Sequence, residues 1–342
     1  MPTPTTRRCI FCHGTLPANE SVEHFPVGRR VAFDPGRGRL WAVCPSCRRW
    51  NLAPFEERWE ALEELEQAYR DTGRVLASTE NVALIQAPGV QLVRVGDARL
   101  AEEAWWRYGG QMMRRRTRAR IMTWAEQAAM IGASVATGGI FYLFLGGDFL
   151  NNLLRWQKFG SIAWRGESHC IRCGGPLTEL SFKAARKLHI TRDNDFEPAL
   201  HLRCRRCQAR GKVGEHQLEG VVAQHVLRRV VTHHHFQGAS EKQVRSATDY
   251  IDRLGAPDAV TRELSKTGLR LDAILARDRR SQALALEIAL NEENERRLLE
   301  MELAELEARW RQEEEIAAIV DGELTGDLGL SRLRKVIRPD GG

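Results

Sequence analysis

Every cysteine in this chain belongs to a Cys-x-x-Cys pair. The four pairs are Cys9/Cys12, Cys44/Cys47, Cys170/Cys173 and Cys204/Cys207. Two such pairs can complete a tetrahedral shell of four thiolates that leaves no coordination position open for a substrate. The sequence therefore predicts two structural metal sites, with one Zn²⁺ in each. A tetrahedral four-sulfur shell suits iron as well as zinc, so the ligands alone do not choose between these metals.

One unit has been used twice in the chain. Cys9-Ile-Phe-Cys12-His-Gly is matched 161 residues later by Cys170-Ile-Arg-Cys173-Gly-Gly, and the gaps to the closing pairs are 31 and 30 residues. In the first unit, residues 31–33 and 40–43 flank a glycine-containing turn, a pattern that predicts a β-hairpin. Residues 9–47 therefore resemble a zinc ribbon. The resemblance implies a small rigid module that depends on its metal for folding.

Three other uses of the cysteines fit less well. Cys9-Ile-Phe-Cys12-His13 matches a haem c attachment motif, but that chemistry requires export and residues 1–8 do not form a signal peptide. Disulfides would require an oxidising compartment. A thioredoxin-like redox site would use a single pair at the start of a helix. We therefore expect a cytoplasmic protein, with attachment to the cytoplasmic membrane as an open alternative.

The charge is unevenly distributed along the 342 residues. The net charge is +6, yet residues 107–120 hold six arginines and no acid, whereas residues 287–315 hold eleven glutamates and four arginines. Such a chain uses its two regions for different partners or pairs one with the other. The length allows two or three small domains.

The expected fold class is α+β, with two small four-cysteine ribbons with short hairpins, a central apolar helix and an all-α C-terminal region containing a long helix or helical hairpin. The expected regions are a first ribbon at 1–54, a helix, β-hairpin and basic helix at 55–126, an apolar glycine-rich segment at 127–147, a second ribbon at 165–215, a helical region with a long acidic helix at 216–320, and a loosely ordered tail at 321–342.

Several elements are specific enough to test. Apolar residues at helical spacing predict a helix over 55–70 that packs on the ribbon, and residues 82–85 and 90–95 predict a second hairpin. Further helices are expected over 100–124 and 217–236, and from Ser240, whose spacing to Gln243 forms a capping box. A long or once-broken helix is expected over 269–319. Its expected coiled-coil seam consists of Leu299, Leu303, Leu306 and Trp310.

Residues 127–147 carry no charge and are long enough to cross a bilayer. The arginines at 114–120 lie where cytoplasmic residues would be expected. Five glycines weaken this interpretation, and a single crossing would move the second cysteine unit out of the cytoplasm. The alternatives are a buried glycine-rich helix, an interfacial helix or a re-entrant hairpin.

No catalytic motif is present, so a non-enzymatic protein without a small-molecule substrate is expected. His233, His234 and His235 are consecutive, and neighbouring residues on a helix point about 100° apart, so the three rings cannot converge on one ion. We expect a surface or helix-end role for them. No phosphate loop, nucleophile elbow or dinucleotide fingerprint is found.

Cations and aromatic residues beside the closing cysteine pairs indicate an alternative function, the binding of nucleic acid. The candidate contacts, for nucleic acid or for another partner, are Arg48, Arg49, Trp50, Arg205, Arg206, Arg114, Arg115 and Arg116. These arginines also fit a plain solvated surface, because arginine is the chain's usual solubilising residue.

Most of the chain resembles a group of uncharacterised bacterial proteins. The runs that carry this likeness are Cys44-Pro-Ser-Cys-Arg-Arg-Trp-Asn-Leu52 with Glu56-Glu-Arg-Trp-Glu-Ala-Leu62, and Ala285-Leu-Glu-Ile-Ala-Leu290 with Ala304-Glu-Leu-Glu-Ala-Arg-Trp310. This likeness implies no activity. The sequence thus predicts a zinc-binding interaction or scaffold protein, with a membrane as an open partner, that binds a protein partner or itself through its C-terminal helices.

Overall fold

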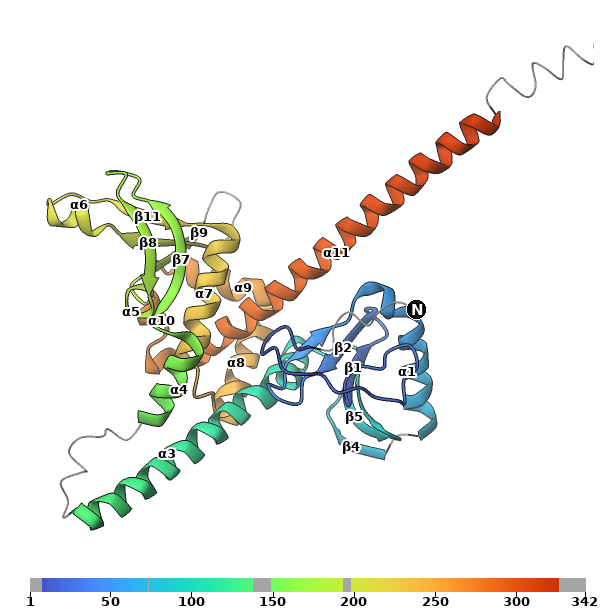
Figure 1. Ribbon diagram of the computed structural model, residues 1–342, viewed down its shortest axis with the longest axis horizontal. Coiled ribbons are helices and arrows are strands. Elements are labelled where there is room, and N and C mark those ends of the chain that lie inside the picture. Colours follow the sequence, from blue (N-terminus) through green and yellow to red (C-terminus); the bar gives the residue numbers. More distant parts are fainter. Residues whose placement is uncertain (1–7, 73, 138–148, 193–197, 326–342) are drawn as a thin grey trace, which may run out of the picture. The chain divides into compact units, whose positions relative to one another are not determined.

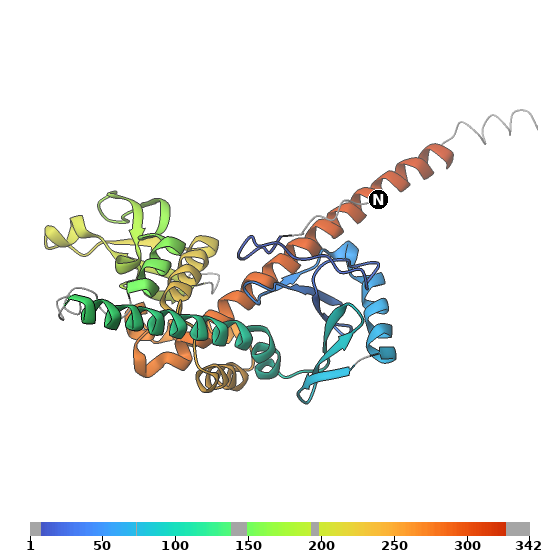
Figure 2. The same ribbon diagram turned by 60° about the horizontal axis from the view of Figure 1, so that its bottom comes forward.

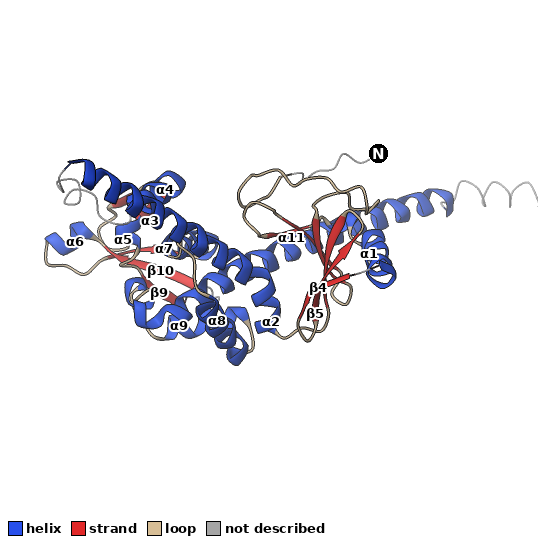
Figure 3. Cartoon of the chain, turned by 90° about the horizontal axis from the view of Figure 1, so that it is seen from below, coloured by secondary structure: helices blue, strands red, loops and turns tan. Residues whose placement is uncertain are grey.

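The computed structural model describes residues 8–72, 74–137, 149–192 and 198–325. Figure 1 follows the chain by colour, and Figure 3 separates its helices from its strands. The protein contains both substantial helices and substantial sheets, which confirms the α+β class. The chain forms two compact units, Met1–Glu293 and Asn294–Gly342.

The first cysteine unit and the hairpin that follows it share a six-stranded sheet of order β3-β2-β1-β6-β5-β4. Its strands are β1 (Arg30–Asp34), β2 (Arg39–Val43), β3 (Trp50–Leu52), β4 (Arg74–Ser78), β5 (Val82–Ala87) and β6 (Val90–Val95). Both predicted hairpins are confirmed. Between them β1 pairs in parallel with β6, with Val31 beside Leu92. The expected boundary at residue 54 therefore falls within one sheet, because β6 satisfies the backbone groups along the other edge of β1.

Both faces of this sheet are covered by apolar side chains. A 3₁₀ turn, η1 (Phe55–Glu57), and helix α1 (Trp59–Thr72) follow β3. Helix α1 buries Leu65 against one face, which confirms the predicted packing of this helix on the ribbon. On the other face the rings of Trp41 and Trp50 pack with centroids 5.4 Å apart. Trp59, one of the regularly spaced apolar residues that predicted this helix, is the first residue of α1 and is 63% exposed, so it does not share the packed face.

The second cysteine unit is built on two smaller sheets, β7–β8 and β11-β10-β9. Its elements are β7 (Ile162–His169), β8 (Pro176–Ser181), α5 (Phe182–Ala185), β9 (His189–Arg192), β10 (Pro198–Arg203), α6 (Arg205–Ala209) and β11 (Glu215–Leu218). The antiparallel strands β7 and β8 flank the third cysteine pair, and β10 and β11 flank the fourth. Each pair is therefore held at the open end of two paired strands.

Helices complete the core behind this second unit. They are α7 (Gly220–His234), α8 (Glu241–Leu254), α9 (Pro257–Lys266), α10 (Leu271–Ile274), the 3₁₀ turn η4 (Arg277–Arg279) and α11 (Arg280–Thr325). The predicted capping box is confirmed, since Ser240 and Gln243 exchange hydrogen bonds at the start of α8. The helix expected from Gln217 begins only at α7, because Gln217 pairs with His201 in the sheet. The long helix expected from about residue 269 begins at α11, after α10 and η4.

The arginine-rich helix is longer than expected. The segments here are α2 (Leu100–Ala104), a π-helical turn η2 (Trp105–Gly109), α3 (Gly110–Thr137) and α4 (Phe149–Phe159). Residues 127–137 of the predicted apolar segment continue α3, while residues 138–147 lie outside the described residues. Within the described ranges, no helix combines the length and the apolar character that a membrane crossing requires.

Helix α11 passes from a buried half to an exposed half. Up to residue 290 it lies in the core with α7 and α8. In the unit that begins at Asn294, Leu303 and Trp310 of the expected seam are more than half exposed. Glu305 and Arg309 form an ion pair at 2.8 Å along the exposed half. Residues 321–325 of the expected loose tail are helical, and the remainder of the tail lies outside the described residues.

A buried ionic cluster connects α3 and α7 to the first turns of α11. The carboxylate of Glu287, only 1% exposed, accepts a hydrogen bond from Arg115 at 2.9 Å and contacts Nδ1 of His235 at 3.1 Å. Burial alone would raise the pKa of Glu287, but the charge of Arg115 and the contact with His235 lower it to about 2. The predicted surface role is therefore wrong for His235, although this residue does end α7.

A second cluster connects η2 to α11 and to the large sheet. The guanidinium of Arg107 lies 3.4 Å from the carboxylate of Glu103 and 2.8 Å from that of Glu292. It also lies within 6 Å of the ring centroids of Trp41 and Trp50. Because Arg107 is 3% exposed, this charge needs all of these neighbours to replace its hydration.

The Glu287 cluster predicts a pH-dependent stability. The lowered pKa stabilises the fold above about pH 4.5, and this contribution is lost as the pH falls towards 2. Replacing Glu287 by Gln leaves the partly buried Arg115 without its counter-charge and removes the carboxylate that contacts His235 at the end of α7, so α7 should lose about 3–5 kcal/mol of local stability at neutral pH. Hydrogen exchange of the α7 amides measures this loss, which should shrink as the pH approaches 2. Glu300→Gln, in an exposed pair with Arg296, should change little. An equal loss of α7 stability in Glu287→Gln and Glu300→Gln would contradict the stabilising role of the Glu287 cluster.

Candidate metal centres

The structure brings the eight cysteines together as two groups of four. All four sulfurs of each group lie within 4.8 Å of one another. In the first group Cys9 and Cys47 are 3.5 Å apart and Cys12 and Cys44 are 3.7 Å apart. In the second group the corresponding separations are both 3.7 Å. A tetrahedron with metal–sulfur bonds of about 2.3 Å has edges of about 3.8 Å. The sulfurs therefore stand where a tetrahedral ion would hold them, and too far apart for disulfides.

Three of the four cysteine pairs form the same tight backbone turn. The residue that follows the second cysteine donates its N–H to the carbonyl oxygen of the first cysteine, at 2.8–2.9 Å in all three turns. That residue adopts a left-handed conformation, with φ of 58° at His13, 64° at Arg48 and 62° at Gly174. The turn directs both sulfurs to one point. Glycine suits this conformation, whereas a side chain there costs about 1 kcal/mol or more.

The fourth pair is helical instead. Cys204 is the N-cap of α6, and Gln208 donates its N–H to the carbonyl oxygen of Cys204 at 3.0 Å. The chain then returns through Gly214, whose carbonyl accepts the N–H of Cys204 at 2.7 Å. The second site therefore combines one tight turn with one short helix. This difference explains why its polar surroundings do not repeat those of the first site.

Asn51 connects the two turns of the first site and was not identified from the sequence. Its side chain is 5% exposed and accepts the N–H of Ile10 at 3.0 Å. Its amide nitrogen donates to the carbonyl oxygens of Ala42 and Arg49. A buried polar side chain that satisfies groups on both cysteine turns fixes their separation. The only signal in the sequence was an asparagine close behind a cysteine pair, a position that many turns share.

Gly214 was also missed. A β-carbon added there would lie 2.5 Å from the sulfur of Cys207 and 3.0 Å from that of Cys170. At Gly175, just after the tight turn in the same unit, an added β-carbon would lie 3.2 Å from the sulfur of Cys173. Backbone at Gly214 therefore packs directly on the sulfurs, and only a residue without a side chain leaves the cluster undisturbed.

The thiols within a group do not titrate alike. The hydrogen bond from Cys47 lowers the pKa of Cys9 to about 4, and the same contact, with burial, raises the pKa of Cys47 well above its usual range. The backbone N–H of Cys173 lowers the pKa of Cys170 to about 6, whereas burial raises that of Cys207 to about 12. Four neighbouring thiolates repel one another, so protons remain within a cluster until a cation replaces them.

The other candidate contacts are divided between the surface and the interior. Arg49 packs its guanidinium 4.5 Å from the ring centroid of Phe11, Trp50 is buried against the large sheet, and Arg115 pairs with Glu287. Arg116 is half-buried. The exposed candidates are Arg48, Arg114, Arg205 and Arg206, of which the last two lie on α6.

Two of the exposed candidates meet in one groove. Arg30, Arg48 and Arg114 line an open groove of about 460 Å³ together with Trp50 and Trp106. Burial and the neighbouring charge of Arg48 lower the pKa of Arg30. Arg114 also donates to the carbonyl oxygen of Pro45, within the second cysteine turn, at 2.6 Å. The described lining contains no acidic side chain, so the groove presents an uncompensated positive charge.

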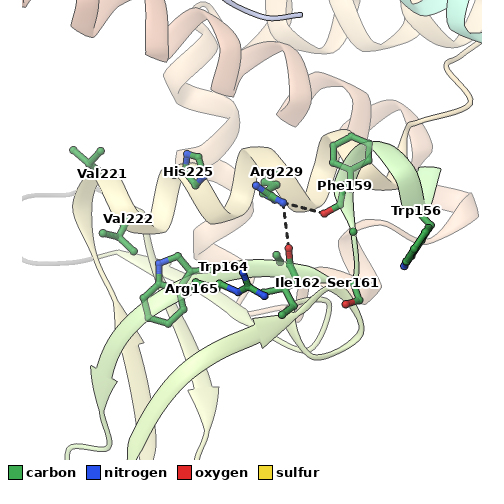
Figure 4. A pocket seen from close by; sticks show the side chains of 12 residues that line it. Trp156, Phe159, Ser161, Ile162, Trp164, Arg165, Val221, Val222, His225 and Arg229 are labelled. Carbon is green, nitrogen blue, oxygen red and sulfur yellow. Dashed lines mark hydrogen bonds between the residues drawn. The ribbon is translucent and has the colours of Figure 1, made fainter. Parts of the chain in front are cut away.

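A second groove, of about 760 Å³, lies between α4, β7 and α7 (Figure 4). Its wall combines apolar and polar side chains, among them Trp156, Trp164 and His225. Arg229 is engaged with the carbonyl oxygens of Phe159 and Ile162, at 3.0 and 3.2 Å. Ser161 and His225 lie at opposite ends of the groove in Figure 4, so they do not form a nucleophile and base pair.

No protein-family model, curated protein or solved structure matches the chain. The resemblance to zinc ribbons therefore rests on the cysteine clusters and their hairpins. The likeness to uncharacterised bacterial proteins gains no support from these comparisons.

The contact between Gly214 and the sulfurs predicts a selective loss of metal. Gly214→Ala should weaken binding at the second site by roughly 10–100-fold, because its β-carbon displaces Cys207 and Cys170. Competition with a chromophoric chelator would measure the metal released per chain. Gly110→Ala is the control, since nothing lies within 4 Å of its added β-carbon. Identical metal retention in both variants would refute the role assigned to Gly214.

Proposed function

We propose that this protein is a non-enzymatic interaction scaffold whose two ribbons are each held together by one structural Zn²⁺. The observation that carries this proposal is the pair of complete four-sulfur shells. A shell of four thiolates leaves a metal no open position for substrate, so the metal would contribute folding energy instead of catalysis. Thiolates that hold a metal persist best in a reducing compartment, so the proposal includes a cytoplasmic location.

Zinc is proposed over iron because its filled d-shell imposes no geometry of its own and it does not cycle between oxidation states at a thiolate site. Metal analysis of the purified chain should find two zinc ions per molecule. Iron at both sites would instead support a redox or electron-transfer role and would overturn the scaffold proposal.

Metal in the first site would also order the structure around it. The second cysteine turn receives Arg114 from α3 at the carbonyl oxygen of Pro45. Arg49, just behind the same turn, covers Phe11 of the opposite turn. Joining the two turns through a metal would therefore fix both the ribbon and its contact with α3.

This dependence predicts the effect of Cys44→Ser. The variant should retain one zinc instead of two, and the first ribbon should become sensitive to protease, because small ribbons bury too little apolar surface to fold alone. The core of α7, α8 and the start of α11 should keep its helicity. Circular dichroism, limited proteolysis and zinc content would be measured together. Cys204→Ser is the matched control, which should expose the second ribbon and spare the first. An intact first ribbon in Cys44→Ser would disprove the structural role of its metal.

The exposed half of α11 supports the partner-binding part of this proposal. Met301, Leu303, Trp310 and Ile316 are each more than half exposed. Large apolar side chains on one otherwise charged helix are typical of surfaces that bind a protein partner or a second copy.

A second candidate function, nucleic-acid binding, is supported by the groove that holds Arg30, Arg48 and Arg114. Arg48 is the informative residue. It is exposed, has no ion-pair partner among the described residues, and occupies a left-handed position, whereas the residue after the closing pair of the second unit, Gln208, lies in α6. A strained arginine in an anion-attracting groove supports a role for its side chain in binding phosphate.

The variant Arg48→Gly distinguishes phosphate binding by Arg48 from a contribution of this residue to the stability of the first ribbon. The variant should stabilise the first ribbon by about 1 kcal/mol, because glycine suits the left-handed conformation. It should also lower the slope of log affinity against log salt concentration for single-stranded oligonucleotides by about 0.7, because one phosphate is no longer neutralised. Thermal unfolding and fluorescence anisotropy at several salt concentrations would test both effects. His13→Gly relieves the same strain outside the groove and should leave binding unchanged. Unaltered oligonucleotide binding by Arg48→Gly would rule this candidate out.

A further inference from the structure

The exposed half of α11 is built from helix alone. In the unit that begins at Asn294, the described residues 294–325 form no other element. Figure 2 shows this stretch, coloured orange to red, continuing as one helix. A helix gains most of its stability in a protein by packing an apolar face against a neighbour. The exposed apolar side chains of this half therefore mark where a neighbour would pack.

The seam predicted from the sequence forms one apolar stripe on this helix. Its residues, at the a and d positions of a heptad, are Leu299, Leu303, Leu306 and Trp310. Leu303 is 54% exposed and Trp310 is 58% exposed, while the other two are half-buried. Met301 is 65% exposed, but it lies about 200° around the helix from Leu303 and so points away from the seam.

Acidic side chains flank this seam. Glu300 and Glu307 stand at e positions along one side, and Glu302 stands at a g position along the other side. Arg309 occupies the next g position. Glu300 and Arg309 each form an ion pair at 2.8 Å within α11 itself, which leaves Glu302 and Glu307 as further negative charge on the two sides. The flanks are therefore complementary to a helix that carries lysine or arginine beside its own apolar stripe.

A second copy of the helix fits the seam less well than a basic helix. In a parallel pair of copies, Glu302 would face Glu307 of the other copy, and in an antiparallel pair centred on the seam, Glu300 would face Glu307. Only the contact of Glu302 with Arg309, in the antiparallel pair, would be attractive. Like charges at these positions oppose pairing, so the charge pattern favours a different helix over self-association.

We propose that the exposed half of α11 binds a basic amphipathic helix of another protein along this seam. The inference rests on the partner-binding part of the scaffold proposal and names the chemistry of the partner. Apolar side chains of the partner would pack between Leu303 and Trp310, and its cations would lie beside Glu302 and Glu307. The seam extends over about 18 Å of helix, a length that suits a short recognition helix.

The experiment measures the binding of synthetic peptides to the full, zinc-loaded chain by fluorescence anisotropy. The basic probe carries leucine at every a and d position and lysine at every e and g position. The acidic probe replaces each lysine by glutamate, and the shuffled probe keeps the composition of the basic probe without its apolar stripe. The basic probe should bind at least roughly tenfold more tightly than the other two. Its binding should weaken with added salt, because salt screens the flanking glutamates.

Leu303→Gln should weaken binding of the basic probe by roughly tenfold or more, because the leucine is no longer buried against the probe. Met301→Gln is the matched control, since Met301 is similarly exposed on the same helix but points away from the seam. It should bind like the unmodified chain. Leucine, methionine and glutamine have similar helix propensities, so both variants should keep their helicity and their zinc.

Equal binding of the basic and shuffled probes, or an equal loss of binding in Leu303→Gln and Met301→Gln, would overturn the proposal. Absence of binding by a chain that holds two zinc ions would also overturn it, and would leave the metal part of the scaffold proposal intact. Self-association that Leu303→Gln abolishes, in a chain that does not bind the basic probe, would assign the seam to a second copy instead. Metal analysis of the same sample tests the scaffold proposal separately.

Discussion

The mutual repulsion of four thiolates is the constraint on which much of this structure depends. Each group gathers sulfurs from two cysteine pairs about thirty residues apart in the chain and holds them within 4.8 Å of one another. A cation resolves the repulsion, and the intervening strands provide the distance between the turns. In the first unit those strands continue into a six-stranded sheet, and α3 contacts the second cysteine turn through Arg114. The gathering of four sulfurs in the first unit thereby involves the six-stranded sheet and α3 as well as the cysteine turns.

Part of the charge asymmetry of the chain is neutralised inside the protein, where two residues of the arginine-rich segment pair with two glutamates of α11. Arg107 reaches Glu292 and Arg115 reaches Glu287, so the basic segment neutralises the beginning of the acidic one. Successive arginines on a helix point about 100° apart, so Arg114 faces the ribbon while Arg115 faces the core. Six clustered arginines in the sequence therefore do not form one basic surface.

The two cysteine units differ in the residues and the secondary structure that surround their sulfurs. In the first, His13 and Arg48 occupy left-handed positions, whereas in the second Gly174 stands at the position of His13. The first unit also presents the arginine groove, whereas the second replaces one tight turn by α6. Repetition of the metal ligands thus preserved the sulfur geometry and left the surrounding surfaces free to diverge, which is consistent with different partners for the two units.

The sequence by itself determined the features that depend on local chemistry. Paired cysteines, the capping box at Ser240 and the glycine-containing turns act over a few residues, so spacing alone predicted both four-cysteine groups, both hairpins and the start of α8. Only the tertiary structure decided the parallel pairing of β1 with β6, the burial of His235 beside Glu287, and the contacts of Gly214 with two sulfurs. These features join segments that are far apart in the chain, and neither periodicity nor residue type carries information about which distant segment will meet which. The apolar run that begins within α3 was evident in the sequence, but the return of the chain along α4 depends on hydrogen bonds from Asn151 and to Glu126 that only packing creates.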